Sequence, residues 1–237
     1  MSDISTLIHD TTVWLLVVLS MVTWVLIVVK VLQTRKAHQQ SIQFVETFWT
    51  SKTLKDAVLK SNAAEGPSAR VAQSGFEALI HADGKSHQDL QQSWSRQDLL
   101  ERHLRKQILA ERRDLDKGTA VLASIGNNAP FIGLFGTVFG IIHALKAIAV
   151  SGNASMDTVA GPIGEALIAT GLGIAVAVPA VLAYNYFIRK GKTVGAELDD
   201  FATDLVSLNQ KNGFKVPTVE ISNPSTVKNI QSEGVLA

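Results

Sequence analysis

The sequence predicts an all-α protein with three transmembrane helices and long cytoplasmic helical extensions. The chain of 237 residues is 46% hydrophobic, and its mean hydropathy of +0.19 is higher than is usual for soluble domains. Its apolar residues are concentrated in three runs, 11–29, 118–145 and 158–188, in which Glu165 is the only residue with a formal charge. Each run is close to or above the ~20 residues that a helix needs to cross a bilayer.

The first run predicts a transmembrane helix over 13–32, preceded by a periplasmic N-terminus over 1–12. It does not have the form of a signal peptide, because no basic segment precedes it and no small-residue cleavage pattern follows it. Lys30 lies near the inner end of this helix. We expect its long stem to carry the ammonium group to the lipid headgroups.

Residues 33–117 predict a cytoplasmic helical domain. Apolar residues recur in it at helical spacing, as at Leu100, Leu104 and Ile108. The Gly66-Pro67 pair is the expected break within this domain. No loop breaker occurs between Ser86 and Lys117, so we expect the last helix of the domain to run into the second span as one rod.

The second and third runs predict transmembrane helices over 118–149 and 158–188. The periplasmic loop between them, 150–157, is short and rich in Ser, Gly and Asn. The two helices should therefore form an antiparallel hairpin.

The third helix is expected to continue as a cytoplasmic helical extension over 189–214. An apolar stripe with spacings of four and three residues supports this extension and predicts packing on a neighbour: Val194, Leu198, Phe201, Leu205 and Leu208. From 215 to 237 the composition is polar, which predicts a flexible C-terminal tail.

The distribution of lysine and arginine predicts the orientation, since cytoplasmic flanks of membrane helices carry the positive excess. Residues 1–10 contain two aspartates and no base, whereas basic residues bracket the segment 33–117 and directly follow the third span. We therefore expect a multi-pass protein with a periplasmic N-terminus and a cytoplasmic C-terminus.

The composition and motifs exclude several classes of function. The chain has no cysteine, which rules out disulfides and thiolate metal sites, and nothing else in it predicts a metal site or a cofactor. The basic residues form no patch interleaved with aromatic residues, so nucleic acid is not an expected partner. The sequence contains no HExxH, GxSxG or Walker motif and no second membrane carboxylate to pair with Glu165, so an enzyme is not expected.

Glu165 is the main candidate for a functional residue. The insertion of an ionised carboxylate at membrane depth costs about 3 kcal/mol of free energy on insertion scales. Such a residue is therefore expected to have either an ion-pair partner or a function. Lys146, near the outer end of the second span, is the one candidate for an ion pair. We interpret Glu165 as a proton-exchanging residue that faces a pore or another subunit. The alternative is a glutamate near the outer interface that reaches water, since it lies only ~10 Å along its helix.

Small residues predict close helix packing around this site. Four of them recur with Glu165 at every fourth position, on a face that another helix can approach closely: Gly161, Ala169, Gly173 and Ala177. The alternative is that they only pack the second and third spans together. The second span has a similar set: Gly133, Gly136 and Gly140.

Thr137, Thr170 and His143 are further polar candidates in these two helices. A hydroxyl can relay a proton or hold water, but a threonine in a membrane helix more often bonds its own preceding carbonyl. A histidine can titrate near neutral pH, but in such a position it is more often a packed or interfacial side chain. The residues alone leave these roles open.

Two functions from different classes therefore remain. One is a ring-forming channel or stator that converts a proton gradient into movement of a partner, for which both the membrane acid and the close packing are needed. The other is a passive scaffold ring that anchors partners, for which the packing alone is enough.

Two runs of the sequence resemble the signature membrane segments of the MotA/TolQ/ExbB proton-channel family. They are ASIGNNAPFIGLFGTVFGI (123–141) and GPIGEALIATGLGIAVAVPAVLAYN (161–185). Three spans favour the ExbB and TolQ branches over the flagellar stators, which have four, and the first run favours the ExbB branch. Phe139 stands where tryptophan is common in the family, and outside these helices the resemblance is faint.

The resemblance implies a proton pathway that contains Glu165, Thr137 and Thr170, which stand at the positions of the family's membrane glutamate and its two polar threonines. It also implies a homo-oligomeric ring in the bacterial inner membrane, a pentamer in this family, that encloses the membrane helices of an ExbD-like single-span protein. Proton flow would then drive a TonB-like protein that energises outer-membrane transport. A TolQ-like role in envelope integrity is the alternative within the family.

Overall fold

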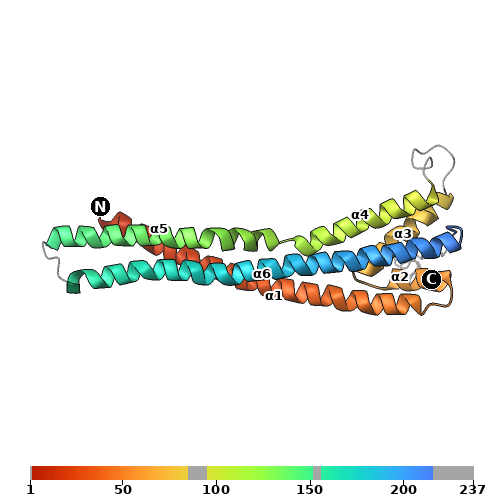
Figure 1. The fold of residues 1–237 in the computed structure, drawn as a ribbon, viewed down its shortest axis with the longest axis horizontal. Coiled ribbons are helices and arrows are strands. Elements are labelled where there is room, and N and C mark those ends of the chain that lie inside the picture. The colour runs from red at the N-terminus through yellow and green to blue at the C-terminus, as the bar shows by residue number, and fades with distance from the viewer. Residues whose placement is uncertain (1, 85–94, 152–155, 216–237) are drawn as a thin grey trace, which may run out of the picture. The chain divides into compact units, whose positions relative to one another are not determined.

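The computed structural model describes residues 2–84, 95–151 and 156–215, and its regular elements are all α-helices (Figure 1). In chain order they are α1 (Ser2–Trp49), α2 (Leu54–Ala63), α3 (Pro67–Gly84), α4 (Arg96–Asp116), α5 (Thr119–Ser151) and α6 (Met156–Lys211). Three stretches are long and apolar enough to cross a membrane: Leu7–Trp49, Arg96–Val150 and Ile163–Lys211. The predicted fold class is therefore confirmed. The centre of the predicted loop 150–157 and the predicted tail from 216 onward lie outside the described residues.

The chain divides into two compact units, each of which is described separately. The first unit, Met1–Lys36 with Glu111–Ala196, contains the start of α1, all of α5 and the first part of α6. The second unit, Ala37–Ala110 with Glu197–Ala237, contains the end of α1, α2, α3, most of α4 and the end of α6.

The first unit has an apolar exterior around a core of mainly small side chains. The buried cluster comes from α1, α5 and α6: Leu16, Ile125, Ala129, Val176, Ala177 and Ala180. Large apolar side chains of the same helices point outward, such as Trp14 at 69% and Leu182 at 65% exposure. Lipid, unlike water, does not penalise exposed apolar side chains, so this distribution is typical of helices that lie in a bilayer.

The helix that enters the second predicted span is interrupted at Gly118. α4 ends at Asp116 and α5 begins at Thr119, and Gly118 has a φ of +82°, in the left-handed region that side chains disfavour. The predicted single rod is therefore wrong. The break falls on the first residue after the segment that lacks loop breakers.

Lys30 of α1 supplies a hydrogen-bond donor to the end of α4. The residue is only 3% exposed, and its ammonium donates to the carbonyl of Leu115 and, at 3.1 Å, to Gln33 Oε1. Gln33 Nε2 in turn donates to the carbonyl of Asp114 at 3.3 Å. The last carbonyls of a helix have no donor within the helix, so these two side chains fill that need. The expectation that the Lys30 ammonium reaches the headgroups is wrong, because its partners lie within the protein.

Aromatic rings form the centre of the second unit. The ring of Phe48 in α1 lies 5.4 Å from that of Phe201 in α6 and 6.3 Å from that of Phe76 in α3, between centroids. Phe44 adds an edge-on contact with Phe201 at 5.9 Å. These rings are buried, as are the other residues of the predicted α6 stripe up to Leu205, so this stripe packs as its spacing predicts.

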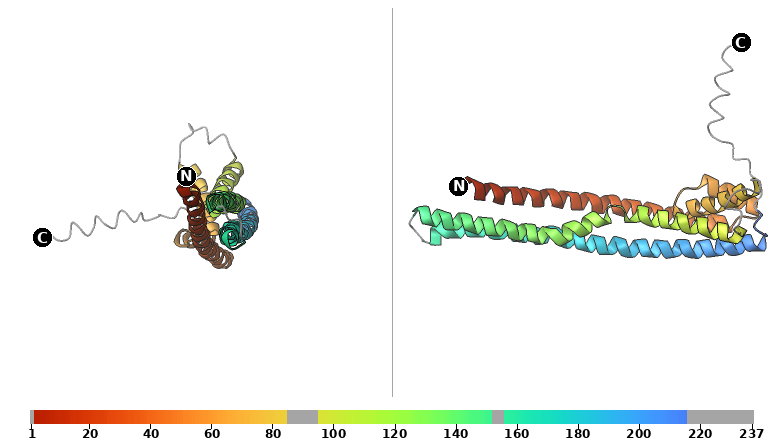
Figure 2. Two further views of the ribbon diagram at one scale, coloured as in Figure 1. Left: turned by 90° about the vertical axis from the view of Figure 1, so that its left-hand side faces the viewer. Right: turned by 90° about the horizontal axis from the view of Figure 1, so that it is seen from above.

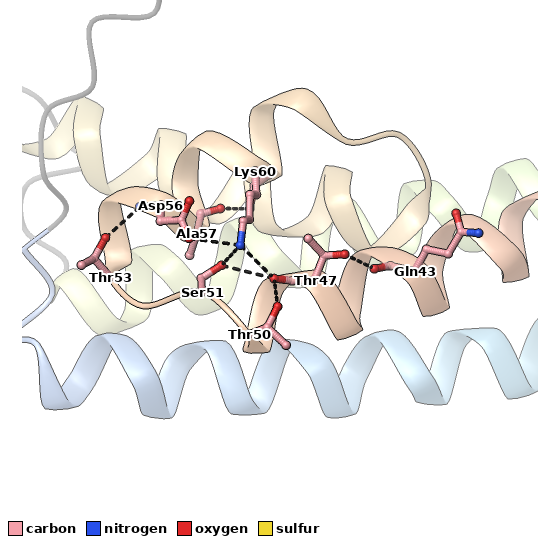
Figure 3. Close-up of polar contacts among 9 residues, drawn as sticks. Gln43, Thr47, Thr50, Ser51, Thr53, Asp56, Ala57 and Lys60 are labelled. Carbon is pink, nitrogen blue, oxygen red and sulfur yellow. Dashed lines mark hydrogen bonds and ion pairs between the residues drawn. The ribbon is translucent and has the colours of Figure 1, made fainter.

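Side chains close the turn between α1 and α2 (Figure 3). Thr53 caps the N-terminus of α2, where its hydroxyl accepts a hydrogen bond from the backbone N–H of Asp56 at 3.2 Å. Lys60 pairs with Asp56 at 3.1 Å and donates to Ser51 Oγ at 3.1 Å. The next break is the predicted one, since α3 begins at Pro67 after Gly66 with a φ of +111°.

We expect Lys30→Met to lower the free energy of unfolding by about 1.5–3 kcal/mol, the usual contribution of a hydrogen bond to a charged group. The physical reason is that the Leu115 carbonyl loses its donor. Lys36→Met, which removes an exposed lysine of the same helix, is the control and should change this free energy by less than about 0.5 kcal/mol. Thermal unfolding of the purified variants in detergent measures both. Equal melting temperatures for the two variants would show that the Lys30 contacts add nothing to stability.

Candidate functional site

The helices that carry the candidate residues, α5 and α6, run side by side and approach until their backbones touch (Figures 1 and 2). A Cβ atom at Gly133 would lie 2.6 Å from the carbonyl oxygen of Ala169 and 3.1 Å from Thr170 Cα. A Cβ atom at Gly173 would lie 2.6 Å from the carbonyl oxygen of Ala129. Neither position can hold a side chain unless the two helices move apart.

The contact continues toward the C-terminal end of α5 at Gly136 and Gly140. A Cβ atom would lie 3.0 Å from Ala169 Cβ at the first position and 2.5 Å from Ala166 Cβ at the second. We call this contact the glycine seam, which consists of Gly133, Gly136 and Gly140 of α5 and Ala166, Ala169 and Gly173 of α6. It is the feature that fixes which side of α6 faces α5.

Glu165 lies directly beside the glycine seam but points away from it. Ala166 is fully buried against Gly140, whereas Glu165 is exposed. Lys146 is exposed as well, and no ion pair joins the two within the described part of the chain. Ile168, three positions further and therefore on the same side of the helix, is an apolar side chain that is 59% exposed. A carboxylate beside such a side chain in a bilayer is costly unless it meets water or a polar group.

The predicted strip of residues at every fourth position divides between two faces of α6. Ala169 and Ala177 are buried and Gly173 touches α5, whereas Glu165 is exposed and a Cβ atom at Gly161 would meet nothing within 4 Å. Four residues turn an α-helix by about 400°, so such a strip drifts by about 40° at each step. This drift places Glu165 at the exposed edge of the packing face, and its role there stays a prediction. The packing role of Gly161 stays a prediction that another chain would have to fulfil.

Thr137, Thr170 and His143 lie in different surroundings. Thr137 is buried at 6% exposure, and its hydroxyl donates to the carbonyl of Leu134 at 2.7 Å, which is the local bond that sequence reasoning left open. Thr170 is half-buried, with its Cα against Gly133. His143 is half-buried, and its Nδ1 is shielded from solvent without a hydrogen-bond partner among the residues that the structure describes.

His9 is a polar neighbour of the glycine seam that sequence reasoning missed. Its Nδ1 lies 3.2 Å from the carbonyl oxygen of Gly136. The predicted span began at residue 13, but α1 begins at Ser2, so His9 belongs to the helix rather than to a preceding segment. A helical pattern was available in the sequence, because His9, Thr12, Leu16 and Leu19 continue one stripe at spacings of three and four residues.

Most of the acidic residues and histidines that the structure describes are spread along its helices. Over residues 2–84, 95–151 and 156–215, no three His, Cys, Asp or Glu side chains are grouped so that they could hold a metal ion. The polar groups near the glycine seam can donate, accept or exchange protons.

A family model and individual known proteins both place this chain in the same family. Residues 63–200 match the MotA/TolQ/ExbB proton channel family, and this range contains all of α5 and most of α6. The biopolymer transport protein ExbB of Neisseria meningitidis serogroup A is 40% identical over 84% of this chain and 91% of its own length. The ExbB protein of Xanthomonas campestris strain B100 is 36% identical, over 80% of this chain and 77% of its own length. The Tol-Pal system protein TolQ of Pseudomonas aeruginosa is 30% identical, over 81% of this chain and 84% of its own length. The resemblance carried by the two membrane runs is therefore confirmed.

We expect Gly133→Ala to destabilise the chain by about 1–3 kcal/mol, the usual cost of overpacking, because its methyl group would meet the α6 backbone. Val138→Ala is the control, since it shortens an exposed side chain of the same helix without adding any atom. Thermal unfolding in detergent measures the difference between them. If both variants melt at the wild-type temperature, α5 and α6 do not pack through the glycine seam.

Proposed function

Because the chain belongs to the MotA/TolQ/ExbB proton channel family, we propose that it is a proton-channel or stator subunit of the bacterial inner membrane. In this proposal the proton gradient energises a TonB-like protein for transport across the outer membrane. One observation carries the mechanism, namely that Glu165 is exposed on an apolar face of α6 while its neighbour Ala166 is locked in the glycine seam. The packing of Ala166 thus fixes the side of the helix from which the Glu165 side chain extends.

A carboxyl group in this position can exchange protons as its surroundings change. An apolar surrounding favours the neutral acid, and water or a nearby cation favours the carboxylate. The same group therefore binds a proton in one arrangement of the complex and releases it in another. In this role Glu165 provides one half of a proton path, and a carboxylate of a partner provides the other.

Thr137 and Thr170 belong to the same proposed path. The proton of the Thr137 hydroxyl is already donated to Leu134, but its oxygen keeps a lone pair that can accept a hydrogen bond from water. Thr170 lies on α6 beside Gly133, about one helical turn from Thr137 along the glycine seam. The two hydroxyls thus lie along the same contact that orients Glu165, where they can accept or donate hydrogen bonds as the complex rearranges.

A second face of α6 supports assembly with other chains. Cβ atoms at Gly161, Gly164 and Gly171 would meet nothing within 4 Å, and these positions are spaced as one helical stripe with Ile168 between them. Small residues let another membrane helix approach closely. We assign this face to the homo-oligomeric ring, a pentamer as in the resembled family, and to an ExbD-like single-span protein within it.

The alternatives differ in what they require of Glu165. A TolQ-like subunit for envelope integrity would use the same carboxyl group, and the higher identity to the ExbB relatives favours the ExbB reading. A passive scaffold ring would not need the carboxyl group at all. Catalysis has no support in the motifs of the chain, and we propose that the protein is not an enzyme. The flanking basic residues support a periplasmic N-terminus and a cytoplasmic C-terminus.

We expect Glu165→Gln to abolish gradient-dependent uptake in cells that lack the native gene and express the variant with its partners. Glutamine has nearly the same size but cannot bind and release a proton. Glu46→Gln, which neutralises an exposed glutamate of α1, is the control and should support normal uptake. Normal uptake with Glu165→Gln would contradict the proton path and favour the scaffold.

Thr137→Val should lower uptake by about tenfold, whereas Thr137→Ser should keep most of it. A single general acid or base typically changes a reaction rate by a factor of order 10²–10⁴, and we expect a hydroxyl that only relays or positions a proton to contribute less. Valine has the shape of threonine without the hydroxyl. The same uptake assay, with membrane levels of the chain checked by immunoblot, measures both variants. A normal rate with valine would remove this hydroxyl from the proposed path.

A further inference from the structure

His9 and the residue that follows Glu165 lie at the same level of the first unit, on the same side of α5. Gly140 is the reference point for this level, because a Cβ atom there would lie 2.5 Å from Ala166 Cβ and 3.4 Å from His9 Nδ1. Ala166 directly follows Glu165 in the chain. The three helices α1, α5 and α6 therefore meet at one glycine, one residue from the carboxyl group of the proposed path.

The His9 contact is a directed hydrogen bond between two helices. A backbone carbonyl can only accept, so the proton of this bond belongs to His9 Nδ1, which donates to the Gly136 oxygen at 3.2 Å. Both the neutral ring with its proton on Nδ1 and the doubly protonated ring can make the bond. The Gly136 oxygen has a second lone pair for the N–H of Gly140 in the α5 helix.

The glycines make this bond possible. A side chain at Gly140 would crowd the ring nitrogen at 3.4 Å, and one at Gly136 would meet Thr12 Cγ2 at 3.0 Å. The absence of side chains at these two positions thus serves two contacts at once, because α1 and α6 both approach α5 at the place where the missing side chain would stand.

The directionality of this bond gives α1 a defined register on α5. Contacts between apolar side chains in lipid allow helices to slide and rotate past one another with little selectivity. A hydrogen bond to one particular carbonyl prevents such sliding and rotation, because its strength falls steeply with distance and angle. His9 thereby fixes the position of α1 on α5 next to the glycine seam, at the level of Glu165.

We propose that His9 is a positioning residue of the proton pathway, which acts by bonding α1 to the Gly136 carbonyl and so holds the α5–α6 contact that orients Glu165. This proposal rests on the proposed function of Glu165. The residue does not itself carry the transported proton. For this role, residue 9 needs one N–H donor that stands as far from the α1 backbone as His9 Nδ1 does.

The first test is rescue by a conservative variant. His9→Leu removes the donor, whereas in His9→Asn the amide nitrogen stands close to the position of Nδ1 and can still donate. We expect gradient-dependent uptake to fall by about tenfold in His9→Leu, in line with the effect of small misplacements on catalysis, and to return to at least half in His9→Asn. His81→Leu, which changes an exposed histidine of α3, should leave uptake normal. Equal losses in the leucine and asparagine variants, or no loss in either, would overturn the proposal.

The second test measures the register without any transport. The chain has no cysteine, and a Cβ atom at Gly136 would lie 3.6 Å from Thr12 Cβ, within the ~3.5–4.5 Å that suits a disulfide. Thr12→Cys with Gly136→Cys is combined with Ala169→Gly, which removes the methyl group that would crowd the new side chain. Oxidation of membranes should cross-link residues 12 and 136 within the chain, more slowly after His9→Leu and at the original rate after His9→Asn.

The outcomes separate the two proposals. An unchanged cross-linking rate in His9→Leu shows that the bond does not set the register and overturns the role of His9. Slower cross-linking together with normal uptake in His9→Leu also overturns it, because the register would then have no effect on the path. Normal uptake in Glu165→Gln refutes the proton path itself, and it does so whatever the cross-linking rates are.

Discussion

Helices α5 and α6 are in backbone contact, and the position of the candidate site follows from this contact. In a bilayer, lipid tails are as apolar as the side chains, so helices gain little from hydrophobic burial and depend on close van der Waals packing. Gly133 and Gly173 allow that packing because each stands where the other helix has backbone atoms. Once Ala166 is locked against Gly140, the preceding residue must face outward. The exposure of Glu165 is therefore a consequence of glycine and alanine positions one residue away.

Two polar side chains of α1 bind neighbouring helices in the same way, by donating a hydrogen bond to a main-chain carbonyl. Lys30 donates to the carbonyl of Leu115, at a helix end, and His9 donates to the carbonyl of Gly136, at a helix position without side chains. Main-chain oxygens are normally hidden by side chains or used by their own helix, so a long apolar helix has few places at which a neighbour can reach them. Both of these places occur in the first unit, and α1 has a hydrogen-bond donor at each.

Features that depend on local pattern were predictable from the sequence. The three apolar runs gave the three long helices, the spacing from Val194 to Leu205 gave a buried stripe, and Gly66-Pro67 gave a break between helices. The interruption at Gly118 was missed because a single glycine also occurs within helices, and its left-handed conformation depends on the contacts around it.

The missed parts of the site depend on which residues meet across helices. Nothing within α1 indicates that Lys30 finds a carbonyl of α4 rather than the headgroups, because that partner is 85 positions away in the chain. His9 lies at the start of an apolar run, where charge and hydropathy point to a flanking segment, and only its place on the stripe with Thr12 and Leu16 gives a helical signal. The separation of Glu165 from Ala169 could have been calculated from the helical repeat, since four residues overshoot one turn.

α6 carries Ala166, Ala169 and Gly173 of the glycine seam on one uninterrupted helix of 56 residues. Each residue turns the helix by about 100°, so the angular phase between Ala166 and Gly173 is set by the number of residues that separate them. One inserted or deleted residue in that interval would turn one of these contacts away from α5. α4 and α5 are free of this restriction, because each begins its own hydrogen-bond ladder on either side of Gly118. Changes of chain length during evolution should therefore be tolerated at the Gly118 junction and excluded from the α6 part of the glycine seam.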